Sequence, residues 1–187
     1  MMAAGEKCIN QDAITEQDRI EAFANILGPI ATDEISRWLI DNGFFRQAAS
    51  TKYHGAYQGG LFDHSLTVTM NLEKLTRRLD IKWERPQSPL IVGMFHDLCK
   101  IDQYKITPDG AFKFVANTPI KGHGSKSVAL LSRMMLVTKE EAACIRYHMG
   151  AFSGNDEIER FTNAIHEYPN VLWTHTADMM AAHIDFV

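Results

Sequence analysis

The sequence has few of the features that mark secreted, membrane-spanning or general polyanion-binding proteins. Its three cysteines, Cys8, Cys99 and Cys144, are odd in number and form no Cys-x-x-Cys motif, so we expect a reduced cytoplasmic protein. No apolar run approaches the roughly 20 residues of a membrane span. The first residues lack a basic segment followed by an apolar one, so we expect no signal peptide. The formal net charge of −4 argues against a general polyanion-binding surface.

The chain has 187 residues, of which 45% are hydrophobic and 22% are charged. This size and composition predict one soluble globular domain. Its apolar residues recur mostly with helical spacing. A first helix is expected to begin after Thr15 and to end at Gly28-Pro29, and a second to run from Thr32 to Asn42-Gly43. Residues 44–49 are expected to add a short helical piece.

The later helices carry polar residues close to their ends. After a glycine-rich loop at 50–60, a long helix is expected from Leu61 to Leu79, with His64 in its first turns. The apolar segment 89–95 predicts a buried helix that ends at His96-Asp97. Further helices are expected at 123–136, 139–148, 158–168 and 171–184.

Residues 103–115 differ from the rest of the chain because apolar and polar residues alternate there. Tyr104-Lys105-Ile106 and Phe112-Lys113-Phe114 flank the turn sequence Thr107-Pro108-Asp109-Gly110, a pattern typical of a β-hairpin. We therefore predict an all-α fold with one small β-hairpin near residues 103–115.

Histidines and aspartates recur along these helices, with about one helix and its connection between successive positions. They are His64, His96-Asp97, His123, His148 and Asp178. Imidazole and carboxylate groups are good ligands for zinc, iron, manganese and similar metals, and helix bundles build metal sites from inward-facing side chains. A histidine taken alone is more often a surface or hydrogen-bonded core residue, and we keep that interpretation for His166 and His183. The spacing by itself specifies no local geometry.

The motifs around these residues resemble the HD-domain superfamily of metal-dependent phosphohydrolases. The resemblance covers residues from about 50 to 185. It rests on Gly60–Leu66 (Gly-Leu-x-x-His-Ser-Leu), His96–Lys100 (His-Asp-x-x-Lys), Gly122-His123, Tyr147–Gly150 and His175–Asp178. These motifs look most like the HD domain of bacterial 3′–5′ exoribonucleases that join an OB-fold to an HD domain, although this sequence has no room for the OB-fold. The resemblance implies that the chain folds as a helical HD bundle. It also implies a single domain over residues 1–187, in which N-terminal helices at 1–45 pack on a catalytic core at 50–185.

The resemblance also implies a metal cofactor of one or two divalent ions, with Mn, Fe, Ni, Co, Zn and Mg all left open. The first ion would be bound by His64, His96, Asp97 and Asp178, and the second by His123 and His148, with Asp97 bridging the two. Gly60 stands where some HD-GYP phosphodiesterases carry a carboxylate for a third metal, and the Gly-Tyr-Pro signature of that group is missing. Activity on cyclic dinucleotides is therefore disfavoured.

Other polar residues are candidates for contact with a substrate. Lys100, one turn beyond the His-Asp pair, would neutralise phosphate charge, although a solvated lysine at a helix end is the simpler interpretation without the family pattern. His54 is a candidate to touch substrate or to donate a proton to the leaving oxygen. Lys126 and Arg146 are candidates for phosphate contact and equally plausible as exposed charges. His175, three residues before Asp178, is expected to contact the metal ligands without binding the metal itself.

The motifs and their resemblance together predict a metal-dependent phosphohydrolase. It would use a metal-activated water to cleave a phosphomonoester or phosphodiester of a nucleotide or nucleic acid. Its expected catalytic residues are Asp97, Lys100 and His54. The expected partner is a phosphorylated small molecule or nucleotide; the negative net charge does not support nucleic acid, and no membrane partner is expected. The oligomeric state is left open. Two alternatives remain: a di-iron oxygenase such as myo-inositol oxygenase, built on the same ligand set, and a non-catalytic, metal-stabilised binding module.

Overall fold

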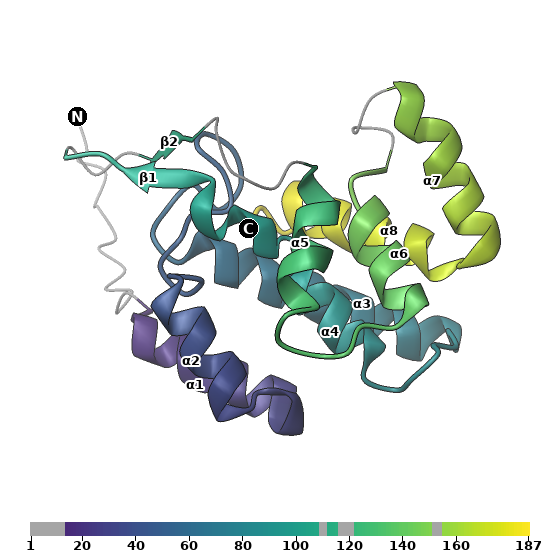
Figure 1. Ribbon diagram of the computed structural model, residues 1–187, viewed down its shortest axis with the longest axis horizontal. Coiled ribbons are helices and arrows are strands. Elements are labelled where there is room, and N and C mark those ends of the chain that lie inside the picture. The colour runs from purple at the N-terminus through teal and green to yellow at the C-terminus, as the bar shows by residue number, and fades with distance from the viewer. Residues whose placement is uncertain (1–13, 109–111, 116–121, 151–154) are drawn as a thin grey trace, which may run out of the picture.

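The protein is a helical bundle with one small sheet. The computed structural model describes residues 14–108, 112–115, 122–150 and 155–187, and within these ranges lie eight α-helices, two short 3-10 helices and one two-stranded sheet (Figure 1). The predicted all-α fold with one β-hairpin is confirmed. In the same ranges, no helix has both the length and the apolar character to cross a membrane.

The N-terminal helices begin and end where local sequence signals predict. They are α1 (Glu16–Leu27), η1 (Gly28–Ile30) and α2 (Asp33–Asp41). The Thr15 hydroxyl accepts a hydrogen bond from the Asp18 amide, and the Asp18 carboxylate accepts one from the Thr15 amide, a capping box that satisfies free backbone donors. Thr32 caps α2 in a similar way, with its hydroxyl accepting from the Ile35 amide.

The prediction of a short helix at residues 44–49 is wrong, because this segment forms turns. A helix over these residues would pair the amides of Ala48 and Ala49 with the carbonyls of residues 44 and 45. The Ala48 amide instead donates to the Gln47 side chain, and the Ala49 amide donates to the carbonyl of Gly55. The carbonyls of Arg46 and Gln47 accept hydrogen bonds from the distant amides of Gly59 and Leu61. The segment is therefore tied to the start of the next helix by pairing that its own sequence does not reveal.

Helix α3 (Gly60–Leu79) lies at the centre of the bundle and packs on α4 (Ser88–Phe95) and α8 (Asn170–His183). A Cβ on Gly93 would lie 2.5 Å from Thr69 Cα, so only glycine permits α3 and α4 to approach this closely. Helix α4 is buried along almost its whole length. It ends at Phe95 with His96 as its C-cap, and η2 (Leu98–Asp102) begins after Asp97.

The second half of the chain adds α5 (His123–Leu131), α6 (Lys139–Tyr147) and α7 (Asn155–Glu167), and both α5 and α8 pack on α6. Helix α5 ends at Leu131, five residues before the predicted end at Leu136. Leu136 is 82% exposed, so a longer helix would bury no further apolar surface there. Its carbonyl instead accepts a hydrogen bond from the Arg85 guanidinium.

The predicted hairpin is present as β1 (Tyr104–Ile106) paired with β2 (Phe112–Phe114) in antiparallel register, with Tyr104 opposite Phe114. Part of the predicted turn, residues 109 and 110, lies outside the described residues. The Gln47 side-chain amide donates to the carbonyls of Ile101 and Tyr104 and fastens the start of the hairpin to the bundle. Along the long axis of the molecule, the hairpin lies at the opposite end from α7 (Figure 1).

Candidate metal centre and its cavity

The predicted metal ligands gather around Asp97, although five separate segments carry them. His64 lies in the second turn of α3, and Asp178 lies within α8. His96 and Asp97 follow the end of α4, His123 begins α5, and His148 caps the end of α6. Of this set, the side chains of His64, His96, Asp97 and His148 are almost completely buried. The packing of α3, α4, α5, α6 and α8 therefore brings these groups to one point.

The two carboxylate oxygens of Asp97 face two different groups of histidines. Oδ2 lies 3.7 Å from His64 Nε2 and 3.5 Å from His96 Nε2. Oδ1 lies 2.6 Å from His123 Nε2 and 3.5 Å from His148 Nε2. A carboxylate that divides its oxygens in this way can bridge two ions held on either side of it.

Hydrogen bonds to the backbone set the tautomers of His64, His96 and His148. The Nδ1 atoms of these three rings lie 2.8, 2.8 and 2.7 Å from the carbonyl oxygens of Val187, Gly93 and Ile145, respectively. A carbonyl can only accept a hydrogen bond, so each Nδ1 carries the proton and each Nε2 presents a lone pair. This is the form in which imidazole binds a metal, with the second nitrogen held by a backbone partner.

The Nε2 lone pairs point at atoms that cannot satisfy them. Among the described residues, the buried Nε2 atoms of His96 and His148 have no hydrogen-bond partner. His64 Nε2 lies 3.1 Å from Asp178 Oδ1, where a lone pair faces a carboxylate oxygen with no proton between them. Buried acceptors left in this way are unfavourable unless a cation binds between them. Three groups of side chains each place their ligand atoms within 4.8 Å of one another: His64, His96 and Asp178; His96, Asp97 and His148; and Asp97, Cys99 and His123. Imidazole, carboxylate and thiol donors fit a divalent transition metal.

Lys100 keeps Asp97 ionised in spite of its burial. Burial alone would raise the pKa of Asp97, but the Lys100 ammonium is the largest of the influences that hold that pKa well below its usual range. Burial opposes ionisation of Asp178 too, and its close contact with His64 is the largest of the influences that lower its pKa. Lys100 Nζ lies 2.6 Å from Asp97 Oδ2, and because that oxygen has two lone pairs, a bound metal can share it with the ammonium.

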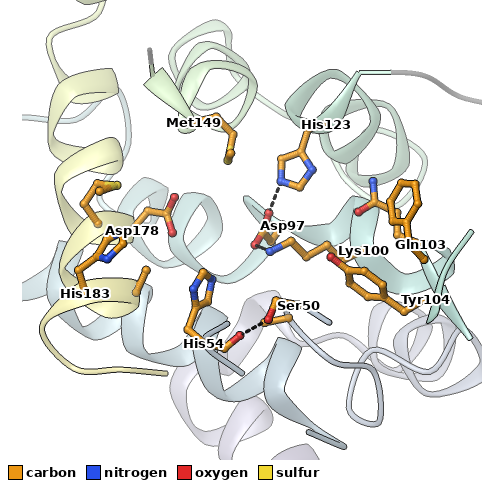
Figure 2. A pocket seen from close by; sticks show the side chains of 14 residues that line it. Ser50, His54, Asp97, Lys100, Gln103, Tyr104, His123, Met149, Asp178 and His183 are labelled. Atoms are coloured by element: carbon orange, nitrogen blue, oxygen red, sulfur yellow. Dashed lines mark hydrogen bonds and ion pairs between the residues drawn. The ribbon is translucent and has the colours of Figure 1, made fainter. Parts of the chain in front are cut away.

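A cavity of about 490 Å³ opens beside this centre (Figure 2). Asp97, His123 and Asp178 line it, so it reaches the candidate metal ligands directly, and Lys100 points into the same space. The remaining lining residues are Ala49, Ser50, His54, Gln103, Tyr104, Phe114, Met149, Met179, Ala182 and His183. A volume of this size falls within the range of roughly 300–1,000 Å³ that is usual for small-molecule sites.

His54 lines the cavity from the glycine-rich loop, and its ring lies against the ring of His64 with centroids 4.8 Å apart. Burial, followed by the neighbouring His64 and Lys100, lowers the pKa of His54 to about 4. The imidazole is therefore neutral at pH 7. Such a ring can hydrogen-bond to a substrate, but it is poorly suited to the proton-donor role that the sequence suggested.

The structure places the other predicted site residues outside the cavity lining. Lys126 is buried and forms an ion pair with Asp102 on η2. Arg146 is exposed, and its guanidinium carbon lies 5.3 Å from the centroid of the Tyr147 ring. His175 Nδ1 donates to the carbonyl of His148 at 2.7 Å, so it contacts the backbone of a candidate ligand.

Several residues of the site were not found by sequence reasoning. Cys99 Sγ lies 3.3 Å from His123 Nδ1, so the thiol contacts the edge of the imidazole ring of a candidate ligand. The Arg19 guanidinium makes two hydrogen bonds with Asp63, the residue before His64, and so joins α1 to α3. His183 lines the mouth of the cavity. Only contacts between distant segments reveal these roles, and no local pattern in the sequence carries a signal for them.

A comparison with protein families matches residues 61–182 to the HD domain family. Comparisons with curated proteins and with solved structures gave no significant match. HD domains bind divalent metals, and their members are commonly metal-dependent phosphohydrolases, so membership implies metal-dependent hydrolase activity in general. The match covers most of the chain and includes all the residues gathered around Asp97. The chain therefore belongs to the HD domain family.

Proposed function

We propose that the protein hydrolyses a phosphate ester of a nucleotide or nucleic acid by means of a metal-activated water. The observation that carries the proposal is the division of the Asp97 carboxylate, with one oxygen facing each histidine group beside a cavity that also contains Lys100. The likeness of the motifs to the HD domains of exoribonucleases supports a nucleotide or nucleic-acid substrate.

The residues divide between two candidate ion positions. One would be held by His64, His96, Asp97 and Asp178, and the other by Asp97, His123 and His148. Ions held there would lower the pKa of water and neutralise charge on the oxygens of a phosphate. The backbone hydrogen bonds to Nδ1 keep the rings in place for this role without reorganisation during the reaction.

Lys100 is the group of the chain best placed to bind phosphate charge. Its ammonium is almost fully buried beside Asp97 and faces the cavity. Burial would lower its pKa, but Asp97 outweighs that effect and keeps the pKa above its ordinary value. A protonated lysine that is almost fully buried interacts more strongly with a negative substrate than an exposed one, so it would stabilise the charge of the transition state.

His54 lines the side of the cavity across from His123 and Met149 (Figure 2). Its neutral ring can accept a hydrogen bond from a substrate hydroxyl or from water. Ser50 Oγ donates to the His54 carbonyl at 2.8 Å and so holds this part of the loop in place. We assign His54 a role in orienting substrate or water.

The test combines metal analysis with a substrate screen. The purified protein is analysed for bound metals and then assayed on phosphate monoesters and diesters with Mn²⁺, Ni²⁺, Co²⁺, Fe²⁺ and Mg²⁺. We expect metal-dependent hydrolysis that Asp97→Ala and His96→Ala abolish. His166→Ala is the matched control, because His166 is exposed on α7 and does not line the cavity.

Three outcomes would contradict the proposal. Absence of hydrolysis with every metal is the first. Hydrolysis that is unchanged in Asp97→Ala is the second. The third is tightly bound iron with oxygen consumption on a polyol substrate, which would identify the oxygenase alternative. If the first outcome occurs and the protein still binds metal, the binding module is the alternative that remains.

A further inference from the structure

Two kinds of side chain line the cavity. Asp97, His123 and Asp178 are candidate metal ligands, and the hairpin with the residue just before it contributes Gln103, Tyr104 and Phe114. Gln103 and Tyr104 lie on the same side of the cavity as Lys100, across from Asp178 and His183 (Figure 2). A ligand that fills the cavity therefore meets the candidate metal ligands on one side and, beyond Lys100, the aromatic side chains of the hairpin on the other.

Two aromatic side chains of the hairpin, Tyr104 and Phe114, line the cavity. Tyr104 and Phe114 are partners across the two strands, and their rings meet edge to face with centroids 6.2 Å apart. Phe114 is 57% exposed although it lines the cavity. An exposed aromatic ring at the mouth of a cavity offers a face on which a flat ligand ring can stack.

Gln103 supplies a polar group beside these rings. Its side-chain amide makes no hydrogen bond with any other residue in the described part of the chain, although the side chain is half-buried. Gln47 is a useful contrast, because its amide is used fully in hydrogen bonds to the backbone of Ala48, Ile101 and Tyr104. A free carboxamide presents a donor and an acceptor side by side, which is the pattern that reads the edge of a nucleobase.

We infer that the hairpin recognises the base of a nucleoside phosphate. The base stacks on the exposed face of Phe114 beside Tyr104, the Gln103 amide hydrogen-bonds to its edge, and the phosphate lies at Lys100 and the candidate metal centre. The inference rests on the proposed function and adds Gln103, Tyr104 and Phe114 as the residues that determine specificity. A cavity of about 490 Å³ has the size for one nucleotide unit, not for a duplex.

The experiment compares an ester that carries a base with the same ester without one. For a monoesterase, the pair is a nucleoside 5′-monophosphate and ribose 5-phosphate. For a diesterase, the pair is a dinucleoside phosphate and its counterpart with an abasic end. Nitrophenyl esters are unsuitable for this comparison, because the nitrophenyl ring can itself stack on Phe114. We expect the wild-type protein to have a kcat/KM at least about tenfold higher on the ester with the base, given the usual strength of base–aromatic stacking.

Two variants test the individual contacts. Phe114→Ala should raise KM for the base-bearing ester about tenfold or more and leave kcat within about twofold, because the ring is far from the reacting phosphate in this arrangement. Gln103→Leu should raise the same KM and narrow the differences in kcat/KM among the four bases. Both variants should leave the ester without a base unaffected. Ile106→Ala is the matched control, since Ile106 lies on the same hairpin, is 56% exposed and does not line the cavity.

The outcomes separate this inference from the proposed function. If no ester is hydrolysed with any metal, the proposed function fails and the inference fails with it. If the wild-type protein hydrolyses both members of a pair equally well, the phosphohydrolase function stands and base recognition is refuted. An equal loss of activity on both esters in Phe114→Ala would also refute it, because it would show that the hairpin supports the fold and does not select the base.

Discussion

Gly124 lies at the contact between the two helices that carry His123 and His148, so a single methyl group there tests how the site is assembled. Helix α5 packs on α6 at this point. A Cβ built on Gly124 would lie 2.3 Å from the carbonyl oxygen of Arg146 and 2.5 Å from that of Ile145. Both neighbours are backbone atoms of a packed helix and cannot rotate away. Gly124→Ala must therefore separate the two helices.

The size of the effect follows from these distances. Real Cβ atoms almost never approach closer than 3.0 Å, so the Arg146 contact has to lengthen by at least about 0.7 Å. Overpacking of this kind destabilises proteins by about 1–3 kcal/mol, and the better helix propensity of alanine offsets up to about 1 kcal/mol of that. A net loss of about 1–2 kcal/mol lowers Tm by roughly 2–8 °C in a domain of this length.

The same separation moves one histidine relative to the other. The rings of His123 and His148 have centroids 5.1 Å apart, and His123 Nε2 lies 2.6 Å from Asp97 Oδ1. Gly124→Ala should therefore weaken the ion position formed by His123 and His148 more than the one formed by His64, His96 and Asp178. The expected result is a reduced metal content with at least one ion retained.

Thermal unfolding and metal analysis of the same preparations measure both effects. Ala129→Ser is the control, because Ala129 is exposed on the same helix and its substitution adds one atom without a clash. A Gly124→Ala protein with unchanged Tm and unchanged metal content would refute the argument that the contact between α5 and α6 sets the geometry of the site.

Four further predictions concern individual residues. Asp63→Asn should lower the free energy of unfolding by about 2–3 kcal/mol in urea titrations, since it leaves the buried Arg19 guanidinium without its carboxylate; a change below about 0.5 kcal/mol would contradict this. Thr138→Ala should cost about 1 kcal/mol through loss of the capping box of α6 and leave kcat unchanged, whereas a large fall in kcat with no loss of stability would contradict it. Burial raises the pKa of the Cys99 thiol from 9.0 to about 12, so the unfolded chain loses this proton at a lower pH than the folded protein does. The free energy of unfolding should therefore fall as the pH rises from 9 towards 12. An equally steep fall in the Cys99→Ala variant would show that other groups cause it. In the native protein at pH 8, Cys99 should also resist iodoacetamide, and rapid modification detected by mass spectrometry would contradict its burial.

The sequence by itself determined the features that depend on neighbouring residues. The threonine caps before α1, α2 and α6 and the Gly28-Pro29 stop act within a turn or two of chain, so their positions follow from local hydrogen bonding. The alternation around Tyr104 and Phe114 predicted the hairpin for the same reason. The sequence also singled out the histidines and aspartates that the structure brings together around Asp97.

Only the tertiary structure decided the features that depend on distant segments. Residues 44–49 form no helix because the Ala49 amide pairs with the carbonyl of Gly55, and the carbonyls of Arg46 and Gln47 pair with the amides of Gly59 and Leu61. The division of the Asp97 oxygens, the contact of Cys99 with His123 and the position of the hairpin beside the cavity all depend on helix packing. Residue spacing along the chain carries no information about such contacts, because they depend on distances set by the packed core and by close approaches such as that at Gly93.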